Sequence, residues 1–586
     1  MCGIVAYIGK NKIASKVVFE GLKNLEYRGY DSWGIAIKKN NTFELFKKIG
    51  KIGNANQKLL KSNLAIGHTR WATHGGVTVE NAHPHLDCTK KIVLVHNGII
   101  ENFEEIKKQL IKNKHRFLSE TDTEVAVHLI EENLKKNNFE NAVKKSFKKL
   151  NGLNAFVIAD IESNQIAAVK NGTPIVIGVG KDEFFVASDI SGISEYTKKI
   201  IFLEDDQMIV LGNRIKLFDI KYDKILKPKI NPLNINIKKE NKGRFRYFLQ
   251  KEIFEQAQII KKTAYEFEEN SRRLSNLIKK AEGVFLVGCG SASYVCLAGT
   301  YLFSNISKIH LNFTTGSEFK YLENYLTSKT LVIAISQSGE TIDILDSVKK
   351  AKNKKAKIAV ITNVFGSSLY RMSDHNFLLN AGAEKAVLAT KSFTTMLAEL
   401  FFASYAAINK KREAKEYLLK ASKNIESILK PKYLKTISGF AKKIKNTKHI
   451  YVIGRGVSYP IAMETALKIK EASYIHAEGF AGGELKHGPI ALIEKKTPVI
   501  VIINDDETKD ETLSNAQEIK ARGGYLIGIG SCNHSVFDKF FKTEDLGYAT
   551  MLPQIVISQL ISYYLTIYRG FDPDKPRNLA KSVTVK

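Results

Sequence analysis

The chain has 586 residues, of which 44% are hydrophobic and 25% are charged, and this composition excludes a mostly disordered or fibrous protein. At roughly 150 residues per domain, the length predicts three or four domains. Lys and Arg number 89 against 60 Asp and Glu, a formal charge of +29. The basic residues form scattered pairs such as Lys38-Lys39 and Lys107-Lys108. We therefore expect solvated surface charge and no nucleic-acid partner.

Cysteine usage and the N-terminus indicate the compartment. The five cysteines are odd in number and form no CxxC pair, so neither a disulfide framework nor a metal site is expected. The N-terminus lacks a basic region, and Gly3 and Gly9 interrupt its apolar stretch. We expect no signal peptide and a cytoplasmic protein.

One uncharged segment, residues 546–568, is apolar enough to require a membrane test. Gln554, Ser558 and Ser562 recur at intervals of four, which places one polar stripe along a helix. This pattern predicts a helix packed against protein rather than one exposed to lipid, so no membrane partner is expected.

The pattern of apolar and polar residues changes along the chain. Residues 2–218 contain short β-like runs and form one predicted domain; residues 219–244 are polar and predicted to be a linker. Beyond them, apolar strands alternate with helical patterns, as in parallel α/β sheets. A buried strand running into a glycine turn occurs at 284–290 and again at 450–456. This repeat predicts two tandem α/β domains, residues 245–425 and 440–575, followed by a tail, residues 576–586.

Cys2 is a candidate nucleophile. Removal of the initiator Met before a small residue would leave Cys2 with a free α-amino group, whose ordinary pKa of about 7.7 to 8 suits it to accept the thiol proton. An early cysteine is weak support by itself, because most are structural.

Polar clusters in the first 125 residues strengthen the case for Cys2. Arg70 and Asp122 could bind the carboxylate and ammonium of an amino acid. Asn97 and the N–H of Gly98 could form an oxyanion hole. The alternatives are a surface ion pair and a hairpin turn, because Asn-Gly is a common turn signal.

The second half carries signals for a phosphorylated small molecule. Residues 336–341, SQSGET, follow a predicted strand and precede a helical pattern, so hydroxyls and backbone N–H groups would meet an anion there. No GK[ST] follows, which favours a sugar monophosphate over a nucleoside triphosphate. Lys468 and Glu471 lie on one helical face and are either a surface pair or a cation and a base. His487 lies between Lys486 and Gly488-Pro489 on a predicted loop.

The N-terminal motifs resemble those of class II glutamine amidotransferases. The matching runs are MCGIV at 1–5, YRGYDS at 27–32, HTRWATHG at 68–75 and HNG at 96–98. The resemblance implies an αββα N-terminal-nucleophile (Ntn) hydrolase fold in which Cys2 attacks the glutamine amide and releases ammonia. It further implies that Trp71 gates an ammonia channel and that the glutamine pocket contains Arg70, Thr73, His74, Asn97, Gly98 and Asp122.

The whole chain is similar to the glucosamine-6-phosphate synthase family, in which the glutaminase precedes two doubly wound sugar isomerase (SIS) domains. The runs that carry this resemblance are SQSGET at 336–341, ATKSFT at 389–394, YIHAE at 474–478, GELKHGP at 483–489 and PRNLAKSVTV at 576–585. The family's substrates are L-glutamine and D-fructose 6-phosphate, with no cofactor or metal, and its members are homodimers.

The family's functional residues carry over position by position. Lys581 would form a Schiff base with the sugar, Glu471 would move a proton between C1 and C2 with Lys468 nearby, and His487 would reach in from the neighbouring subunit to open the ring. The implied sugar-phosphate contacts are Ser291, Ser293, Ser336, Gln337, Ser338, Thr341 and Val387. Which of Ser291 and Ser293 contacts the sugar is open, because CGSAS at 289–293 departs from the family's Cys-Gly-Thr-Ser.

Three other functions compete with this one. A phosphoribosyl amidotransferase would need an acidic pyrophosphate loop after a strand of the second half, and we find none. A sugar-phosphate sensor with decayed chemistry is disfavoured by the joint presence of Cys2, Glu471, His487 and Lys581. A nucleic-acid binder would show binding that weakens steeply with salt.

Overall fold

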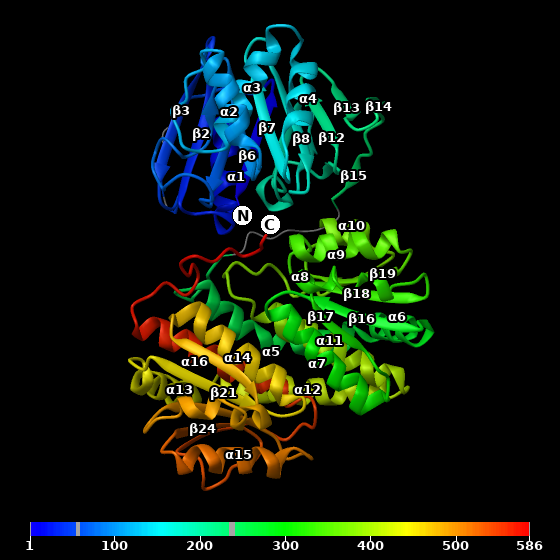
Figure 1. The fold of residues 1–586 in the computed structure, drawn as a ribbon, viewed down its shortest axis with the longest axis vertical. Helices are drawn as coiled ribbons and strands as arrows, with labels where there is room; N and C mark the ends of the chain where they lie inside the picture. The colour runs from blue at the N-terminus through cyan, green and yellow to red at the C-terminus, as the bar shows by residue number, and fades with distance from the viewer. Residues whose placement is uncertain (1, 54, 56–58, 234–240, 585–586) are drawn as a thin grey trace. The chain divides into compact units, whose positions relative to one another are not determined.

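The computed structural model describes residues 2–53, 55, 59–233 and 241–584. Its internal contacts divide the chain into two compact units, one of residues 1–239 with 580–586 and one of residues 240–579. Figure 1 shows the course of the chain through both.

The first unit contains two antiparallel sheets. The eight-stranded sheet has the order β15 (Asn231–Pro232), β11 (Lys199–Phe202), β9 (Val176–Val179), β10 (Glu183–Ala187), β1 (Gly3–Gly9), β4 (Leu64–Arg70), β2 (Ser32–Lys39), β3 (Thr42–Ile49). The seven-stranded sheet has the order β14 (Lys224–Leu226), β13 (Ile215–Asp219), β12 (Gln207–Leu211), β8 (Gln165–Asn171), β7 (Asn154–Asp160), β6 (Ile92–Gly98), β5 (His85–Leu86).

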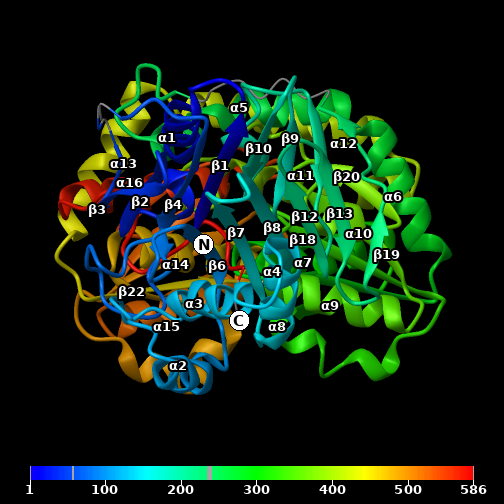
Figure 2. The same ribbon diagram turned by 90° about the horizontal axis from the view of Figure 1, so that it is seen from above.

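Strand alternation produces the layers of this unit. In β1, Ile4 and Ala6 enter the core between the sheets, whereas Val5 and Tyr7 face α1 (Ala14–Asn24). The outer face of the other sheet packs on α2 (Phe103–Lys112), α3 (Thr123–Leu134) and α4 (Phe139–Lys149). Figure 2 shows α1 on one side of the sheets and α2–α4 on the other. The order of layers is αββα, which confirms the predicted fold of this unit.

The second unit contains two parallel five-stranded sheets of identical topology. The first has the order β17 (Asn312–Thr315), β16 (Gly283–Gly288), β18 (Thr330–Ser336), β19 (Lys357–Thr362), β20 (His375–Leu378). The second has the order β22 (His476–Ala481), β21 (His449–Gly454), β23 (Pro498–Ile503), β24 (Tyr525–Gly530), β25 (Lys539–Lys542). In each sheet the first and third strands in chain order are neighbours, a switch point at which such folds bind ligands.

Helices cover both sheets of the second unit and pack in one large hydrophobic core and two smaller clusters. In the first repeat these are α5 (Phe248–Glu266), α6 (Glu268–Lys280), α7 (Ser291–Leu302), α8 (Gly316–Phe319), α9 (Ile342–Asn353), α10 (Ser368–Met372) and α11 (Lys391–Ala407). They continue with α12 (Lys411–Ile428), α13 (Pro431–Ile444), α14 (Ser458–Ser473), α15 (Lys509–Ala521) and α16 (Met551–Tyr568). The predicted pair of doubly wound α/β repeats is confirmed.

The predicted linker and the uncharged segment are both packed against protein over part or all of their length. The first part of the predicted linker pairs with the sheets as β14 and β15, and Leu233 is buried; residues 234–240 lie outside the described residues. The polar stripe of α16 is buried against protein, with Gln554 bonded to Asn504 at 2.8 Å. Among the described helices, none is long and apolar enough to cross a membrane.

Candidate active sites

Cys2 immediately precedes β1, a central strand of its sheet. Its Sγ accepts the backbone N–H of Trp71 at 3.2 Å. Its carbonyl accepts Arg28 Nε at 3.2 Å and Asn97 Nδ2 at 3.1 Å. A Cβ at Gly3 would lie 2.6 Å from Thr69 Oγ1, so the residue after the nucleophile has no room for a side chain. Hydrogen bonds to both its sulfur and its carbonyl oxygen therefore fix the position of Cys2.

The electrostatics around Cys2 favour the thiol. Burial raises the pKa of Cys2 above its ordinary value, and the Trp71 N–H and the positive charges of Arg70 and Arg28 offset only part of that rise. At neutral pH the sulfur therefore retains its proton until a base removes it.

Asn97 and Gly98 end β6 beside Cys2. His68 Nε2 donates to Asn97 Oδ1 at 3.1 Å and to the His96 carbonyl at 2.9 Å, which turns the Asn97 amide N–H₂ toward Cys2. Burial lowers the pKa of His68 to about 3, so the imidazole is neutral. Gly98 has φ +141°, and a Cβ there would lie 2.3 Å from the Leu153 carbonyl oxygen.

Two opposite charges line the same pocket. Arg70, at the end of β4, donates to the carbonyls of Gly76 and Gly75 at 3.1 Å each and also to that of His74. Asp122 precedes α3, and its Oδ2 accepts the Ile100 N–H at 2.8 Å. Both side chains are about 3% exposed. A buried guanidinium and a buried carboxylate at one pocket suit the two charged groups of an amino acid.

The structure brings all eight predicted glutaminase residues to one pocket, with five more to which the sequence analysis gave no role. The predicted residues are Cys2, Arg70, Trp71, Thr73, His74, Asn97, Gly98 and Asp122. The additional residues are His83, His96, Thr121, Thr123 and Thr584.

In the second unit, the SQSGET loop joins β18 to α9 at the switch point of the first sheet. Ser336 Oγ bonds Thr341 Oγ1 at 3.0 Å and accepts the Gly339 N–H at 3.1 Å. Ser338 Oγ accepts the Glu340 N–H at 3.1 Å. Gly339 has φ +66°, and a Cβ there would lie 2.0 Å from Ser367 Oγ. The loop therefore presents hydroxyls at the N-terminus of a twelve-residue helix, as an anion site requires.

The two serines left open by the sequence have different surroundings. Ser293 is buried and donates to the Gly290 carbonyl at 2.6 Å. Ser291 is half-buried at the first position of α7, and its hydroxyl lies near the Glu464 carboxyl, whose pKa it helps to lower.

Lys468 forms ion pairs with two carboxylates on α14. Its Nζ lies 2.5 Å from Glu471 Oε2 and 3.5 Å from Glu464 Oε1. Burial opposes the charge on Lys468, but the two carboxylates raise its pKa overall. Burial raises the pKa of Glu464 to about 8, and Lys468 only partly offsets that rise. Glu471, with its side chain 22% exposed, is the accessible carboxylate.

The remaining predicted sugar residues lie in three places. Val387 is half-buried, and its N–H donates to the Asp574 carbonyl at 3.1 Å. His487 is exposed on the loop after β22. Lys581 belongs to the first unit, whereas Glu471 and the phosphate loop belong to the second.

Models of two known domains match the chain. The glutamine amidotransferase domain matches residues 68–195, and the SIS domain matches twice, at residues 277–404 and 443–565. The first range lies within the αββα unit, and the other two contain the strands of the two parallel sheets.

Curated relatives match from end to end. Proteins named "Glutamine--fructose-6-phosphate aminotransferase [isomerizing]" from Pyrococcus horikoshii and Thermococcus kodakarensis are each 41% identical to this chain, and one from Clostridium perfringens is 38% identical. Each alignment covers 100% of both chains. The chain belongs to the isomerizing glutamine–fructose-6-phosphate aminotransferase family.

A solved structure of the same family matches the second unit. It is the C-terminal domain of a glucosamine-fructose-6-phosphate aminotransferase from Francisella tularensis, with 32% identity and a TM-score of 0.54 over 57% of this chain and 100% of that one. A tagatose-6-phosphate ketose/aldose isomerase from Escherichia coli, 17% identical with a TM-score of 0.50 over 57% of this chain and 97% of that one, shares the fold.

In this aminotransferase chain, three residues that contact the predicted site residues or line their pocket were not predicted from the sequence. Glu464 lies one turn before Lys468 on α14, so the helical period could have found it. His68 was part of a quoted motif but received no role, although it orients Asn97. Thr584, near the C-terminus, lines the pocket of Cys2, and no local pattern connects such distant positions.

Proposed function

We propose that this chain transfers the amide nitrogen of L-glutamine to D-fructose 6-phosphate and isomerises the product, giving D-glucosamine 6-phosphate and L-glutamate. The observation that carries the proposal is the Cys2 pocket, with Arg70 and Asp122 in its wall, in the same polypeptide as a hydroxyl-rich anion loop at an α/β switch point. Membership in the aminotransferase family supports it.

In the glutaminase half, Cys2 is the nucleophile. Removal of Met1 would give Cys2 an α-amine that takes the thiol proton, which is needed because burial raises the thiol pKa. The thiolate attacks the amide carbon, and the resulting oxyanion is stabilised by Asn97 Nδ2 and the Gly98 N–H. Collapse of this intermediate expels ammonia, and water then hydrolyses the thioester to glutamate.

Recognition of glutamine is assigned to the charged wall of the pocket. Arg70 binds the α-carboxylate and Asp122 the α-ammonium, which positions the side-chain amide over Cys2. Thr73 and His74 complete the pocket, and Trp71 gates the passage of ammonia. Thr584 of the tail, which lines the same pocket, favours a role of the tail in retaining ammonia.

In the isomerase half, the loop of residues 336–341 and Ser291 bind the sugar phosphate, and Val387 contacts it. Lys581 forms a Schiff base with the open-chain ketone, and ammonia displaces this lysine as a free amine. The resulting C2 imine acidifies the C1–H bond, so Glu471 can take the C1 proton and return a proton to C2. Lys468 neutralises the Glu471 carboxylate when it is ionised.

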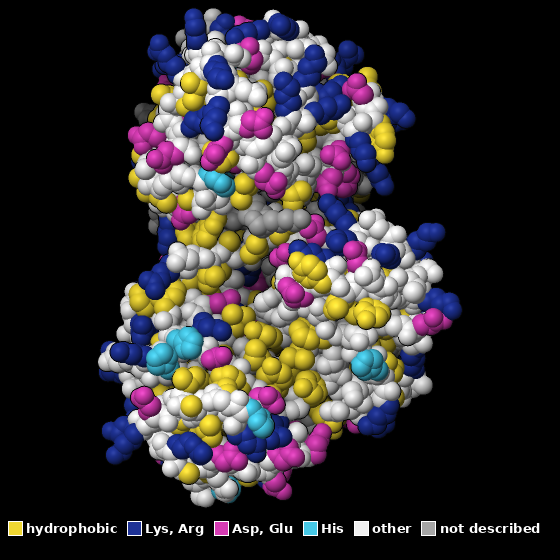
Figure 3. Space-filling view, in the orientation of Figure 1, with side chains coloured by type: hydrophobic (Ala, Val, Ile, Leu, Met, Phe, Trp, Pro, Cys, Tyr) yellow, Lys and Arg dark blue, Asp and Glu magenta, His cyan; other side chains and the backbone are white. Residues whose placement is uncertain are grey.

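The assembly is proposed to be a cytoplasmic homodimer in which His487 acts on the sugar bound to the partner subunit. The exposure of His487 in the single chain supports this arrangement. Figure 3 shows hydrophobic side chains gathered on one face of the second unit, as a subunit contact would require. On the same face of the molecule, Lys and Arg are dispersed among acidic side chains.

Paired variants test the function. Cys2→Ala is expected to abolish glutamine-dependent formation of glucosamine 6-phosphate and to leave phosphosugar isomerisation measurable. Lys581→Ala is expected to abolish synthesis but to spare glutamine hydrolysis. Both reactions are measured by product assay. Full glutamine-dependent synthesis by Cys2→Ala would refute the proposed function.

A further inference from the structure

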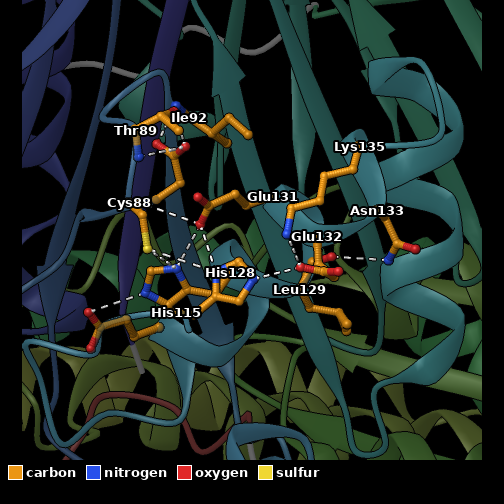
Figure 4. A network of polar contacts seen from close by, with 12 residues as sticks. Cys88, Thr89, Ile92, His115, His128, Leu129, Glu131, Glu132, Asn133 and Lys135 are labelled. Carbon is orange, nitrogen blue, oxygen red and sulfur yellow. Dashed lines mark hydrogen bonds and ion pairs between the residues drawn. The ribbon is translucent and has the colours of Figure 1, made fainter. Parts of the chain in front are cut away.

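A second group of reactive side chains lies in the first unit, and the glutaminase chemistry does not use it. Cys88, His115, His128 and Glu131 each offer one ligand atom, and these four atoms lie within 4.8 Å of one another. They come from three segments: the turn between β5 and β6, the connection after α2, and α3. Figure 4 shows the four side chains converging on one point.

We propose that these four side chains form a binding site for a divalent transition metal of the Zn²⁺ class. The set of one thiolate, two imidazoles and one carboxylate is a combination that Zn²⁺ prefers, and hard cations such as Mg²⁺ do not. With the thiolate and carboxylate ionised and both imidazoles neutral, the ligands carry two negative charges, which neutralise the ion.

The distances between ligand atoms fit a tetrahedral ion. Cys88 Sγ lies 3.6 Å from His128 Nδ1 and 3.8 Å from His115 Nδ1. Bonds of about 2.3 Å to sulfur and 2.0–2.1 Å to nitrogen, at the tetrahedral angle, place these atoms about 3.6 Å apart. Both Nδ1 atoms lie 3.0 Å from Glu131 Oε2, against about 3.3 Å for the corresponding ligands of Zn²⁺. Only small side-chain shifts are therefore needed to admit the ion.

The outer nitrogens of the imidazoles provide a second, independent indication. His115 Nε2 lies 2.8 Å from Glu132 Oε2, and His128 Nε2 lies 3.7 Å from Glu124 Oε1. Glu132 accepts the Nε2 proton of His115, and the Glu124 carboxylate faces the same nitrogen of His128 at ion-pair distance. With the proton on Nε2, each Nδ1 lone pair is directed inward, as in the usual second shell of a histidine metal ligand.

The second shell is itself fixed by the protein. Glu124 accepts the N–H groups of Leu118 and Ser119 at 2.8 and 2.7 Å, and Glu132 pairs with Lys135 at 2.7 Å. Both imidazoles are buried, whereas Cys88 is exposed and provides an entry path for the ion.

The site would link α3 to two loops of its unit. His128 and Glu131 come from α3, whose N-terminal end carries the pocket residues Asp122 and Thr123. Four protein ligands leave no open coordination position, so the ion has a structural role. The four ligands match no known metal-binding sequence motif, because only His128 and Glu131 are close together in the sequence.

The test uses the full chain, treated with a chelator and titrated with Co²⁺ as the spectroscopic probe and with Zn²⁺ as competitor. We expect one ion per chain, a near-ultraviolet thiolate-to-cobalt charge-transfer band, and loss of that band on addition of Zn²⁺. Cys88→Ser should eliminate the band, whereas the control Cys532→Ser, at a half-buried cysteine of the second unit, should retain it.

A second variant separates ligand loss from misfolding. Glu132→Gln leaves all four ligands in place and should weaken Zn²⁺ binding by about 10- to 100-fold, as expected for a second-shell change. Absence of Co²⁺ binding in the wild-type chain, an unchanged band in Cys88→Ser, or unchanged affinity in Glu132→Gln would each overturn the proposal.

Discussion

At Gly98 the backbone alone explains the choice of residue. A φ of +141° lies in the region that favours glycine, and any Cβ would collide with the Leu153 carbonyl oxygen. The position is also the one whose N–H is proposed to stabilise the oxyanion. The backbone conformation at the end of β6 therefore explains both the requirement for glycine and the proposed catalytic role of its N–H group.

Gly98→Ala is expected to lower kcat for glutamine hydrolysis by about 100-fold, because a shift of this backbone displaces one oxyanion donor. Isomerisation of the sugar phosphate should be unaffected. Hydrolysis is measured as glutamate release. Gly76→Ala is the matched control, since only Thr78 Cγ2, at 3.9 Å, lies near its added Cβ. A wild-type hydrolysis rate in Gly98→Ala would show that the oxyanion assignment is wrong.

At the scale of one element, α14 concentrates charge on a single face. Glu464, Lys468 and Glu471 are spaced by four and three residues, and the first two are completely buried. Burial raises the pKa of Glu464 to about 8 and makes it the member of the trio that holds a proton at neutral pH. Glu471, nearer the surface, remains the candidate base.

The raised pKa of Glu464 predicts a pH-dependent stability. Its stabilising contribution is fully present below its ordinary value of 4.5 and is lost as the pH rises through about 8. The groups that face it are Lys468 and Glu471 on α14 and Tyr294 on α7. Glu464→Gln mimics the protonated form, so its stability relative to wild type should rise between about pH 4.5 and pH 8 and then level off.

Thermal unfolding of wild type and Glu464→Gln across this range measures the effect. The exposed Glu426 on α12 offers the control Glu426→Gln, which should follow wild type at every pH. A stability difference independent of pH would show that Glu464 does not titrate in this range.

At the scale of the whole molecule, the proposed sugar chemistry draws on residues from distant parts of the sequence. Lys581 belongs to the first unit, Glu471 to the second, and His487 is proposed to come from another subunit. The proposal therefore makes assembly itself a requirement for activity.

Mixing two inactive variants tests the cross-subunit role of His487. His487→Ala and Glu471→Gln are each expected to be inactive, and mixed dimers should contain one intact site if the two residues act across the interface. Statistical mixing of a two-fold dimer then restores about a quarter of wild-type synthesis. Each variant alone, subjected to the same exchange procedure, is the control. No recovery despite verified subunit exchange would place His487 in the site of its own chain.

The sequence predicted the features that depend on short stretches of chain. Short β-like apolar runs at 4–8 and 155–159 predicted β1 and β7, and the polar stripe of residues 554, 558 and 562 predicted a protein-packed α16. The site motifs were readable because catalysis and anion binding place particular residue types at strand ends. These signals depend only on residues close together in the chain, so they can be read from the sequence.

Only the tertiary structure decided which distant residues meet. His68 orients Asn97 across two strands of different sheets, and Thr584 reaches the pocket of a residue at the other end of the chain. The Cys88 cluster unites three segments with no common spacing. The sequence by itself determined the fold class, the family and the chemical groups at hand. Long-range packing determined their contacts, because burial and side-chain direction depend on pairing between segments that no local pattern records.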